Sequence, residues 1–442
     1  MRRLNLIVII CDTFRADHLG CYGNDRVKTP NLDRLASEGT VFTNCYADGL
    51  PTIPARRVFF TGRSIIPMEV HGGWRPLRDE DVTLSEILQK HGYTTAFITD
   101  TWHYFKPGMN FHRGFDAWEW VRGQEADPWQ SGPKEKFDPF KHAPAHLIEG
   151  NERYQQRILR DLMNTQDIRC EEDYFCARVV RKATLWLERN LGNQPFMLWV
   201  DLFDPHEPWD PPERFKRMYY DAYPCERFIF DYGVRVEDIR EEDLPAIKAL
   251  YAAEVTFVDM WIGHLLRRVE ELGLLDNTII VFSSDHGTHL GEEGCVQKTP
   301  GLLNSCVARL PLIVRYPDRS LAGKRIDALV GAVDFAPSFL DMLGIEERPE
   351  MDGGSFWKLM TGEAESIHEE VFVQFGSFAA VRTRKWHYFQ HTKGEDRGKG
   401  PCLYDLENDP EERVNVLERY PEVVEEMRKR LEERLGRPLP EI

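Results

Sequence analysis

The chain has 442 residues, of which 42% are hydrophobic, and a formal net charge of −17. These values are typical of a globular protein with a large core and room for two or three domains. The negative charge argues against nucleic acid or an anionic membrane surface as the main partner, because both would repel the chain.

Short apolar runs alternate with helical patterns over the first three quarters of the chain. The runs, typical of parallel strands that are covered on both faces, are Asn5–Cys11, Thr94–Thr99, Phe196–Phe203, Thr278–Ser284 and Leu312–Tyr316. The helical patterns are at Asn31–Glu38, Leu84–His91 and Phe257–Leu272. This alternation predicts a doubly wound α/β fold with helices on both faces of a mostly parallel sheet.

The pattern changes after about residue 365. Three closely spaced strand-like segments, Val371–Phe375, Ala379–Thr383 and Trp386–Gln390, predict a small antiparallel sheet, and Pro421–Leu435 predicts a final helix. We therefore predict a catalytic domain over residues 1–365 and an α+β subdomain over residues 366–442. Two stretches rich in charge, aromatics and proline, at about 118–167 and 211–244, are interpreted as insertions in the first domain.

The cysteines and the N-terminus bear on localisation. The nine cysteines are scattered and contain no C-x-x-C pair, which argues against a disulfide framework and favours a reducing compartment. The apolar run at the N-terminus is too short for a signal peptide, and no other run approaches the length of a membrane span. We expect a cytoplasmic protein with no membrane partner; whether it forms a homo-oligomer stays open.

Polar side chains follow four of the predicted strands at the point where each strand ends. In open α/β sheets the carboxyl ends of the strands form the edge where ligands bind, so these residues are candidates for one site. They are Asp12, Thr101, His103, His206, Asp285 and His286. Each alone has a plainer interpretation, since an aspartate after a strand is usually a helix cap. Asp12, Asp285 and His286 together offer two carboxylates and an imidazole, a plausible set of ligands for a divalent metal.

The strings around these residues resemble a known family. The segment from Leu50 to Arg63, L-P-T-I-P-A-R-R-V-F-F-T-G-R, is similar to the sulfatase signature C/S-x-P-x-R, with Thr52 in the place of the nucleophile. Asp12 lies in I-I-C-D-T-F-R-A-D-H-L-G-C-Y-G, and Asp285 and His286 lie in V-F-S-S-D-H-G-T-H-L-G-E. These strings, and others in order along nearly the whole chain, resemble the sulfatase branch of the alkaline phosphatase superfamily. The resemblance implies an alkaline-phosphatase-like fold.

The resemblance also implies roles for individual residues. Asp12, Asp285 and His286 match metal ligands, and Thr52 matches the nucleophile, which also touches the metal. Arg56 matches the arginine that orients the nucleophile. His206 matches a histidine that assists the leaving oxygen, with His103 as a weaker candidate, and Lys298 matches the lysine that balances the charge of the transferring group.

The chain departs from the usual sulfatase pattern at several positions. Most sulfatases have two consecutive aspartates at the first metal position, whereas this chain has Cys11 before Asp12. Thr101 stands where a substrate-binding lysine is usual, and His71 is a candidate substitute contact for the substrate. The phosphonate monoester hydrolases of the superfamily share the single early aspartate and a threonine near position 101, but they keep a cysteine as nucleophile.

Threonine in place of the nucleophile determines the expected chemistry. Sulfatases oxidise a Cys or Ser to formylglycine, and threonine is not a known substrate for that conversion, so we expect no formylglycine. A threonine alkoxide can attack phosphorus, and metal-activated water can cleave the resulting phospho-threonine. We therefore expect hydrolysis of small anionic esters, mainly phosphate mono- or diesters or phosphonate monoesters, through Thr52. One divalent metal is expected, with Mn²⁺ or Zn²⁺ favoured over Ca²⁺.

Three alternatives remain open at this point. The chain could be a sulfatase by descent, either with slow turnover on Thr52 or with its natural nucleophile replaced. It could be a phospho-group transferase, since related phosphoglycerol transferases use a threonine nucleophile. It could also be a binding homologue that has lost turnover, although the retained metal set and Arg56 argue against this.

Overall fold

The computed structural model describes residues 3–71, 73–223, 229, 236–393 and 400–441. Parts of the predicted insertion at 211–244 and of the predicted subdomain at 366–442 therefore lie outside the described residues.

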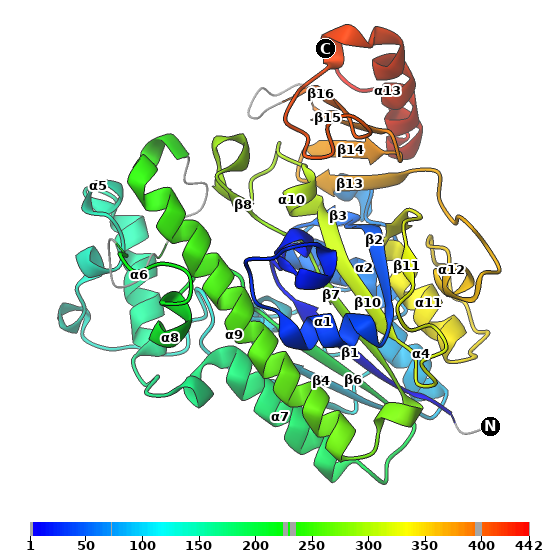
Figure 1. The fold of residues 1–442 in the computed structure, drawn as a ribbon, viewed down its shortest axis with the longest axis horizontal. Coiled ribbons are helices and arrows are strands. Elements are labelled where there is room, and N and C mark those ends of the chain that lie inside the picture. Colours follow the sequence, from blue (N-terminus) through cyan, green and yellow to red (C-terminus); the bar gives the residue numbers. More distant parts are fainter. Residues whose placement is uncertain (1–2, 72, 224–228, 230–235, 394–399, 442) are drawn as a thin grey trace.

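A nine-stranded mixed sheet forms the centre of the molecule (Figure 1). Its strands run in the order β11-β2-β10-β7-β1-β6-β4-β5, with β12 beside β2. Their bounds are β1 Asn5–Cys11, β2 Thr40–Tyr46, β4 Thr94–Thr99, β5 Ala117–Trp120, β6 Phe196–Leu202, β7 Thr278–Ser284, β10 Arg309–Arg315, β11 Arg325–Ile326 and β12 Val330–Gly331. The predictions for β1, β4 and β7 are confirmed with the same bounds, and β6 ends one residue earlier than predicted.

The direction of β10 corrects one prediction. The run at 312–316 was expected to be a parallel strand, but β10 pairs antiparallel with both β7 and β2. An apolar run indicates that a strand is buried on both faces and carries no information about its direction. As a consequence the start of β10, at Arg309, lies at the edge of the sheet where the neighbouring parallel strands end.

Helices cover both faces of the sheet, as the doubly wound pattern predicts. Side chains of β1 alternate between two cores: Leu6 and Val8 pack in one, and Ile7 and Ile9 in the other. The first face is covered by α2 (Thr52–Thr61), α4 (Leu84–Lys90) and α11 (Phe335–Met342), and the second by α1 (Pro30–Ser37), α7 (Phe175–Arg189) and α9 (Leu244–Glu271). The shorter or peripheral helices are α3 (Met68–His71), α5 (Ala145–Ile148), α6 (Glu152–Thr165), α8 (Glu213–Lys216), α10 (Ser305–Ala308) and α12 (Trp357–Thr361). The predicted α/β class is confirmed.

A second, five-stranded sheet lies toward the C-terminus, at the top of Figure 1. Its order is β16-β15-β14-β13-β3, and α13 (Pro421–Leu435) packs on it. The strands are β3 Gly49–Leu50, β13 Val371–Phe375, β14 Phe378–Arg382, β15 Trp386–His391 and β16 Cys402–Asp405. Because β3 leads directly into α2, this sheet is tied to the segment that carries Thr52. The domain boundary near residue 365 stays a prediction.

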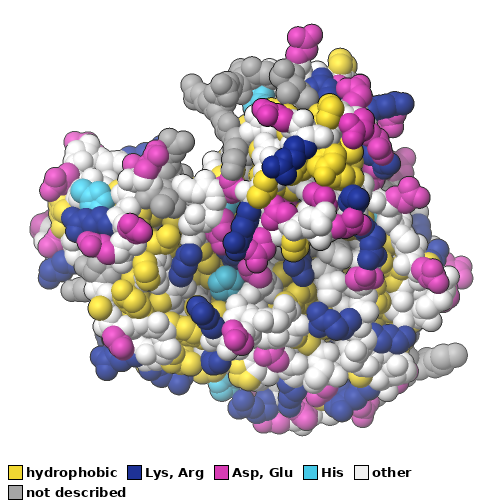
Figure 2. Space-filling model, turned by 45° about the horizontal axis from the view of Figure 1, so that its top comes forward, with side chains coloured by type: hydrophobic (Ala, Val, Ile, Leu, Met, Phe, Trp, Pro, Cys, Tyr) yellow, Lys and Arg dark blue, Asp and Glu magenta, His cyan; other side chains and the backbone are white. Residues whose placement is uncertain are grey.

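Three further observations concern the surface, the helices and the cysteines. Acidic and basic side chains are interspersed over the face shown in Figure 2. In the part of the chain that the structure describes, no helix is both long and apolar enough to cross a membrane. Cys11, Cys21, Cys45, Cys170, Cys176 and Cys306 are free thiols.

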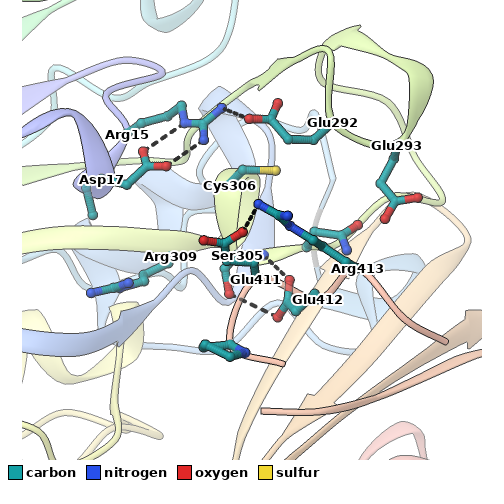
Figure 3. Close-up of a pocket in the computed structure, with 13 residues that line it drawn as sticks. Arg15, Asp17, Glu292, Glu293, Ser305, Cys306, Arg309, Glu411, Glu412 and Arg413 are labelled. Carbon is teal, nitrogen blue, oxygen red and sulfur yellow. Dashed lines mark hydrogen bonds and ion pairs between the residues drawn. The ribbon is translucent and has the colours of Figure 1, made fainter. Parts of the chain in front are cut away.

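A buried carboxylate joins the second sheet to α10, the short helix that precedes β10. Glu412 accepts hydrogen bonds from the backbone N–H of Ser305 (2.6 Å), from the Ser305 hydroxyl (3.0 Å) and from Arg382 (2.5 Å). His387 Nδ1 lies 3.0 Å from the same carboxylate. These partners hold the pKa of Glu412 below its ordinary value despite burial. Figure 3 shows Glu412 beside Ser305, while the neighbouring Glu411 pairs with Arg413.

Replacing Glu412 with alanine is expected to lower the free energy of unfolding by about 3–5 kcal/mol, because Arg382 would be left buried without its carboxylate. Glu411→Ala is the matched control: its partnership with Arg413 is solvent-exposed, so the expected loss is below about 1 kcal/mol. Urea unfolding followed by fluorescence measures both variants. Equal losses in the two variants would contradict the role assigned to Glu412.

Candidate active site

The candidate metal ligands come together where two adjacent parallel strands end. Asp12 follows β1 and Asp285 follows β7, and the register of these strands places Cys11 opposite Ser284. Asp12, Asp285 and His286 are fully buried, and one ligand atom from each lies within 4.8 Å of the others. The predicted clustering of these three residues is therefore observed.

The orientation of His286 indicates that the site is built for a cation. Its Nδ1 lies 2.9 Å from the carbonyl oxygen of Gly287, which can only accept, so Nδ1 carries the proton. Burial lowers the pKa of His286 to about 4, which keeps the ring neutral. Its Nε2, buried and without a hydrogen-bond partner among the described residues, faces Asp285 at 3.4 Å and Asp12 at 3.7 Å. A lone pair that faces two carboxylates is repulsive unless a cation lies between them, so these residues fit a divalent metal.

The glycine of the D-H-G segment is required by close packing. A Cβ on Gly287 would lie 2.1 Å from the carbonyl oxygen of Cys306, which is backbone and cannot move aside cheaply. The Gly287 N–H also donates to the carbonyl of Val307 at 2.7 Å. Any side chain at this position would displace the neighbouring His286.

Thr52 is the first residue of α2, a helix whose ten residues are all buried. The N–H groups at the start of a helix have no intrahelical acceptor, and together with the helix dipole they favour an anionic group beside Thr52. Residues four apart share one face of a helix, which places Arg56 below Thr52. Arg57 points elsewhere, to Asp81 and to the carbonyl of Pro76.

Arg56 connects the metal-ligand set to a third strand. Its Nη1 donates to Asp12 (2.9 Å) and to Asp285, while its Nε and Nη2 donate to the two oxygens of Asp201 at 3.1 and 2.8 Å. The guanidinium is fully buried among these three carboxylates. The hydrogen bonds from all three nitrogens of the guanidinium thus fix Arg56 in one orientation below Thr52.

Asp201, which the sequence analysis missed, lies in β6. It is the one charged residue in an apolar run, and that contrast was the available signal. Besides Arg56, its carboxylate accepts hydrogen bonds from the Thr101 hydroxyl (2.9 Å) and the Tyr104 hydroxyl (2.7 Å). The Thr101 side chain is therefore directed at Asp201, and its predicted contact with substrate stays a prediction.

His206 and Lys298, which were predicted from separate motifs, are in contact. The Lys298 ammonium lies 2.7 Å from His206 Nε2, and it donates to Glu207 at 3.1 Å and to the Thr13 hydroxyl at 3.5 Å. His206 Nδ1 lies 2.6 Å from the carbonyl of Glu207, so Nδ1 carries the ring proton and Nε2 accepts from Lys298. Glu207 was not predicted from the sequence; it supplies the counter-charge for Lys298.

This arrangement predicts that His206 remains neutral at all ordinary pH values. Burial, and then the Lys298 ammonium, lower the pKa of His206 from 6.5 to about 3. As the pH falls below 6.5, the unfolded chain binds a proton at this histidine before the folded chain does, so stability is lost from there down to about pH 3.

The imidazole titration of His206, followed by NMR and assigned with a His206→Gln variant, is expected to have its midpoint far below 6.5. In Lys298→Met the midpoint should rise, but burial should still hold it below that value. A wild-type midpoint near 6.5 would contradict the observed geometry.

His103 lies near His206, in the short helix η3 (Trp102–Phe105), with Phe203 in contact with both rings. The His103 ring is 6.0 Å from that of Phe203, which stacks on His206 at 4.2 Å. His103 Nε2 lies 3.0 Å from Glu125, a buried carboxylate in the predicted insertion at 118–167. Burial lowers the pKa of His103, and the nearby Glu125 opposes this shift.

The remaining candidate is His71. It is exposed at the end of α3, and within the described ranges no contact places it with the other candidates. Its predicted contact with substrate stays a prediction.

Comparisons with known proteins identify the family. Residues 4–345 match the family described as Sulfatase, and residues 291–437 match the one described as N-sulphoglucosamine sulphohydrolase, C-terminal. The chain belongs to the sulfatase family. The resemblance stated from the motifs is thereby confirmed, and sulfatase-family membership makes this protein an ester hydrolase.

Curated relatives in the sulfatase family match along nearly the whole chain. The N-acetylglucosamine-6-O-sulfatase of Bacteroides thetaiotaomicron is 30% identical, over 94% of this chain and 83% of the relative. The ulvan-active sulfatase of Formosa agariphila is 27% identical, over 99% of this chain and 81% of the relative. Among solved structures, the phosphonate monoester hydrolase of Agrobacterium radiobacter has the same fold, with a TM-score of 0.77 at 23% identity, over 98% of this chain and 96% of that one.

Proposed function

We propose that the protein hydrolyses phosphate mono- or diesters, or phosphonate monoesters, through a covalent intermediate on Thr52. The observation that carries this proposal is the residue itself: a threonine at the buried start of α2, one turn before Arg56. The formylglycine hydrate of sulfatases expels sulfate by breaking its own C–O bond, and a sulfo-threonine has no such route because its Cβ carries no second hydroxyl. A phospho-threonine can instead be cleaved by water at phosphorus.

Each residue of the site has a separate role in the proposed reaction. A divalent metal held by Asp12, Asp285 and His286, with Mn²⁺ or Zn²⁺ favoured, would supply Lewis-acid stabilisation of the transferring group and lower the pKa of the Thr52 hydroxyl. Thr52 Oγ attacks phosphorus after losing its proton to water, and the bond to the leaving oxygen breaks. Arg56, fixed beneath Thr52, keeps the Thr52 side chain in position for the attack.

Lys298 is favoured over His206 as the donor of the proton to the leaving oxygen. The Nε2 of His206 carries no proton and accepts a hydrogen bond from the Lys298 ammonium. Of the two groups, Lys298 is therefore the one with a proton that it can donate to the leaving oxygen. In this role His206 positions Lys298, and the Glu207 carboxylate keeps Lys298 protonated until the leaving group departs. Water then attacks phosphorus and the bond from phosphorus to Thr52 Oγ breaks, which releases the phosphate or phosphonate. Thr52 Oγ takes a proton from the attacking water, and Lys298 regains its proton from solvent.

The sulfatase relatives favour a second candidate function, the hydrolysis of sulfate esters. The named relatives are sulfatases, and the match to them covers almost all of this chain. For this candidate Thr52 would have to form a sulfo-threonine that water cleaves at sulfur.

A matched series of 4-nitrophenyl esters separates the two functions. With protein loaded with Mn²⁺ or Zn²⁺, we expect kcat/KM for 4-nitrophenyl phosphate or 4-nitrophenyl phenylphosphonate to exceed that for 4-nitrophenyl sulfate by at least about tenfold, equivalent to about 1.4 kcal/mol of transition-state binding. Faster turnover of the sulfate ester would establish the second candidate and overturn the first. Metal removal by a chelator should abolish turnover of either ester.

A further inference from the structure

Lys106 has no carboxylate partner among the described residues, and it lies in the cluster of aromatic rings around His103. Lys106 directly follows η3, and its Nζ lies 4.0 Å from the ring centroid of Trp102 and 5.2 Å from that of Trp74. The two indoles hold the ammonium by cation–π attraction, which fixes it in place without neutralising its charge. Lys106 is partly buried, and Trp74 is 44% exposed.

A chain of ring contacts connects this lysine to the proposed proton donor. Trp74 packs edge-on against His103, with ring centroids 4.8 Å apart. His103 contacts Phe203, which in turn stacks on His206, the ring that accepts from Lys298. Lys106 is therefore linked through packed rings to His206 and Lys298, the pair beside which the proposed mechanism places the leaving oxygen.

The charge of Lys106 is unmatched within the part of the chain that the structure describes. No carboxylate there forms an ion pair with it. Glu125 is the acid that acts on it electrostatically, and that carboxylate is engaged by the Trp102 N–H (3.1 Å), by His103 (3.0 Å) and by Arg157 (3.6 Å). A partly desolvated ammonium without a counter-ion is unfavourable, and an arriving anion relieves that cost.

We propose that Lys106, held between Trp74 and Trp102, binds a second anionic group on the leaving portion of the substrate. The preferred substrates are then esters whose alcohol or phenol carries a carboxylate, sulfate or phosphate of its own. This proposal rests on the proposed function only in requiring ester cleavage at Thr52; it is independent of whether phosphorus or sulfur is attacked.

The test compares two esters that differ by one carboxylate, 4-nitrophenyl phosphate and its 3-carboxy derivative, or the corresponding sulfates if the wild type turns those over faster. The ratio of their kcat/KM values is measured in wild type, Lys106→Met and Lys106→Arg. Lys90→Met is the matched control, since Lys90 is an exposed lysine paired with Glu347. The comparison between proteins cancels the intrinsic reactivity of each ester.

We expect the preference for the carboxylated ester to fall by about tenfold in Lys106→Met, and to be retained in Lys106→Arg and in Lys90→Met. Equal changes for both esters in Lys106→Met would overturn the proposal. Failure of the wild type to cleave either ester would instead count against the proposed function. The anion site is then tested by calorimetric binding of the same esters to Thr52→Ala protein, where Lys106→Met must weaken the carboxylated ester more than the plain one.

Discussion

Replacing Thr52 with alanine is expected to lower kcat by about 10⁴ or more, because the variant has no oxygen to form the covalent intermediate. Binding should change much less, since the other three candidate metal ligands, Arg56 and Lys298 all remain. Steady-state kinetics on the best 4-nitrophenyl ester give kcat, and calorimetry with the intact ester gives the affinity.

Two control variants test whether the effect of Thr52→Ala comes from loss of the Thr52 hydroxyl. Thr52→Ser keeps the nucleophilic oxygen and should retain much of the activity. Thr61→Ala removes a buried hydroxyl from the same helix, which donates to the carbonyl of Arg57 and accepts from the backbone N–H of Arg63, and it should leave kcat nearly unchanged. Undiminished turnover in Thr52→Ala would show that another group attacks the ester.

Replacing Asp201 with alanine is expected to have the second large effect. Arg56 would lose two hydrogen bonds from its guanidinium and would remain buried, so the free energy of unfolding should fall by about 3–5 kcal/mol. Because Arg56 would no longer be fixed beneath Thr52, kcat should also fall, by about 10², the loss that a misplacement of about 1 Å can cause. Thermal unfolding and steady-state kinetics measure the two effects.

Asp201→Asn separates positioning from simple stability. The amide keeps one oxygen that can accept from Arg56 and nearly the same volume, so this variant should recover a large part of kcat. If Asp201→Ala is destabilised but its remaining folded fraction has wild-type kcat, then Asp201 supports the fold alone and does not position Arg56.

Much of the central sheet could be predicted from the sequence, for a clear physical reason. Strands that are buried on both faces, such as β1, β4 and β7, appear as continuous apolar runs with sharp ends. Features set by long-range pairing could not be predicted in this way. The antiparallel direction of β10 depends on its neighbours β7 and β2, and β2 itself has a mixed sequence that gives no continuous run.

The same distinction applies to the active site. The clustering of Asp12 with Asp285 and His286 followed from their positions at the ends of parallel strands. The partners of Arg56 and Lys298 could not be predicted from strand ends. Asp201, for example, reaches Arg56 only through the register that pairs Ile10 with Asp201 across β1 and β6. Motifs thus predicted the candidate reacting groups, and the structure was needed to find the carboxylates that contact them.

The measurement that tests the central claim most directly is intact-protein mass spectrometry of metal-loaded protein, quenched shortly after mixing with 4-nitrophenyl phosphate, 4-nitrophenyl phenylphosphonate or 4-nitrophenyl sulfate. The account predicts a phosphoryl or phosphonyl adduct that maps to Thr52, decays as turnover proceeds and is absent in Thr52→Ala. An adduct on another residue, or turnover with sulfate as the one ester that modifies Thr52, would contradict it.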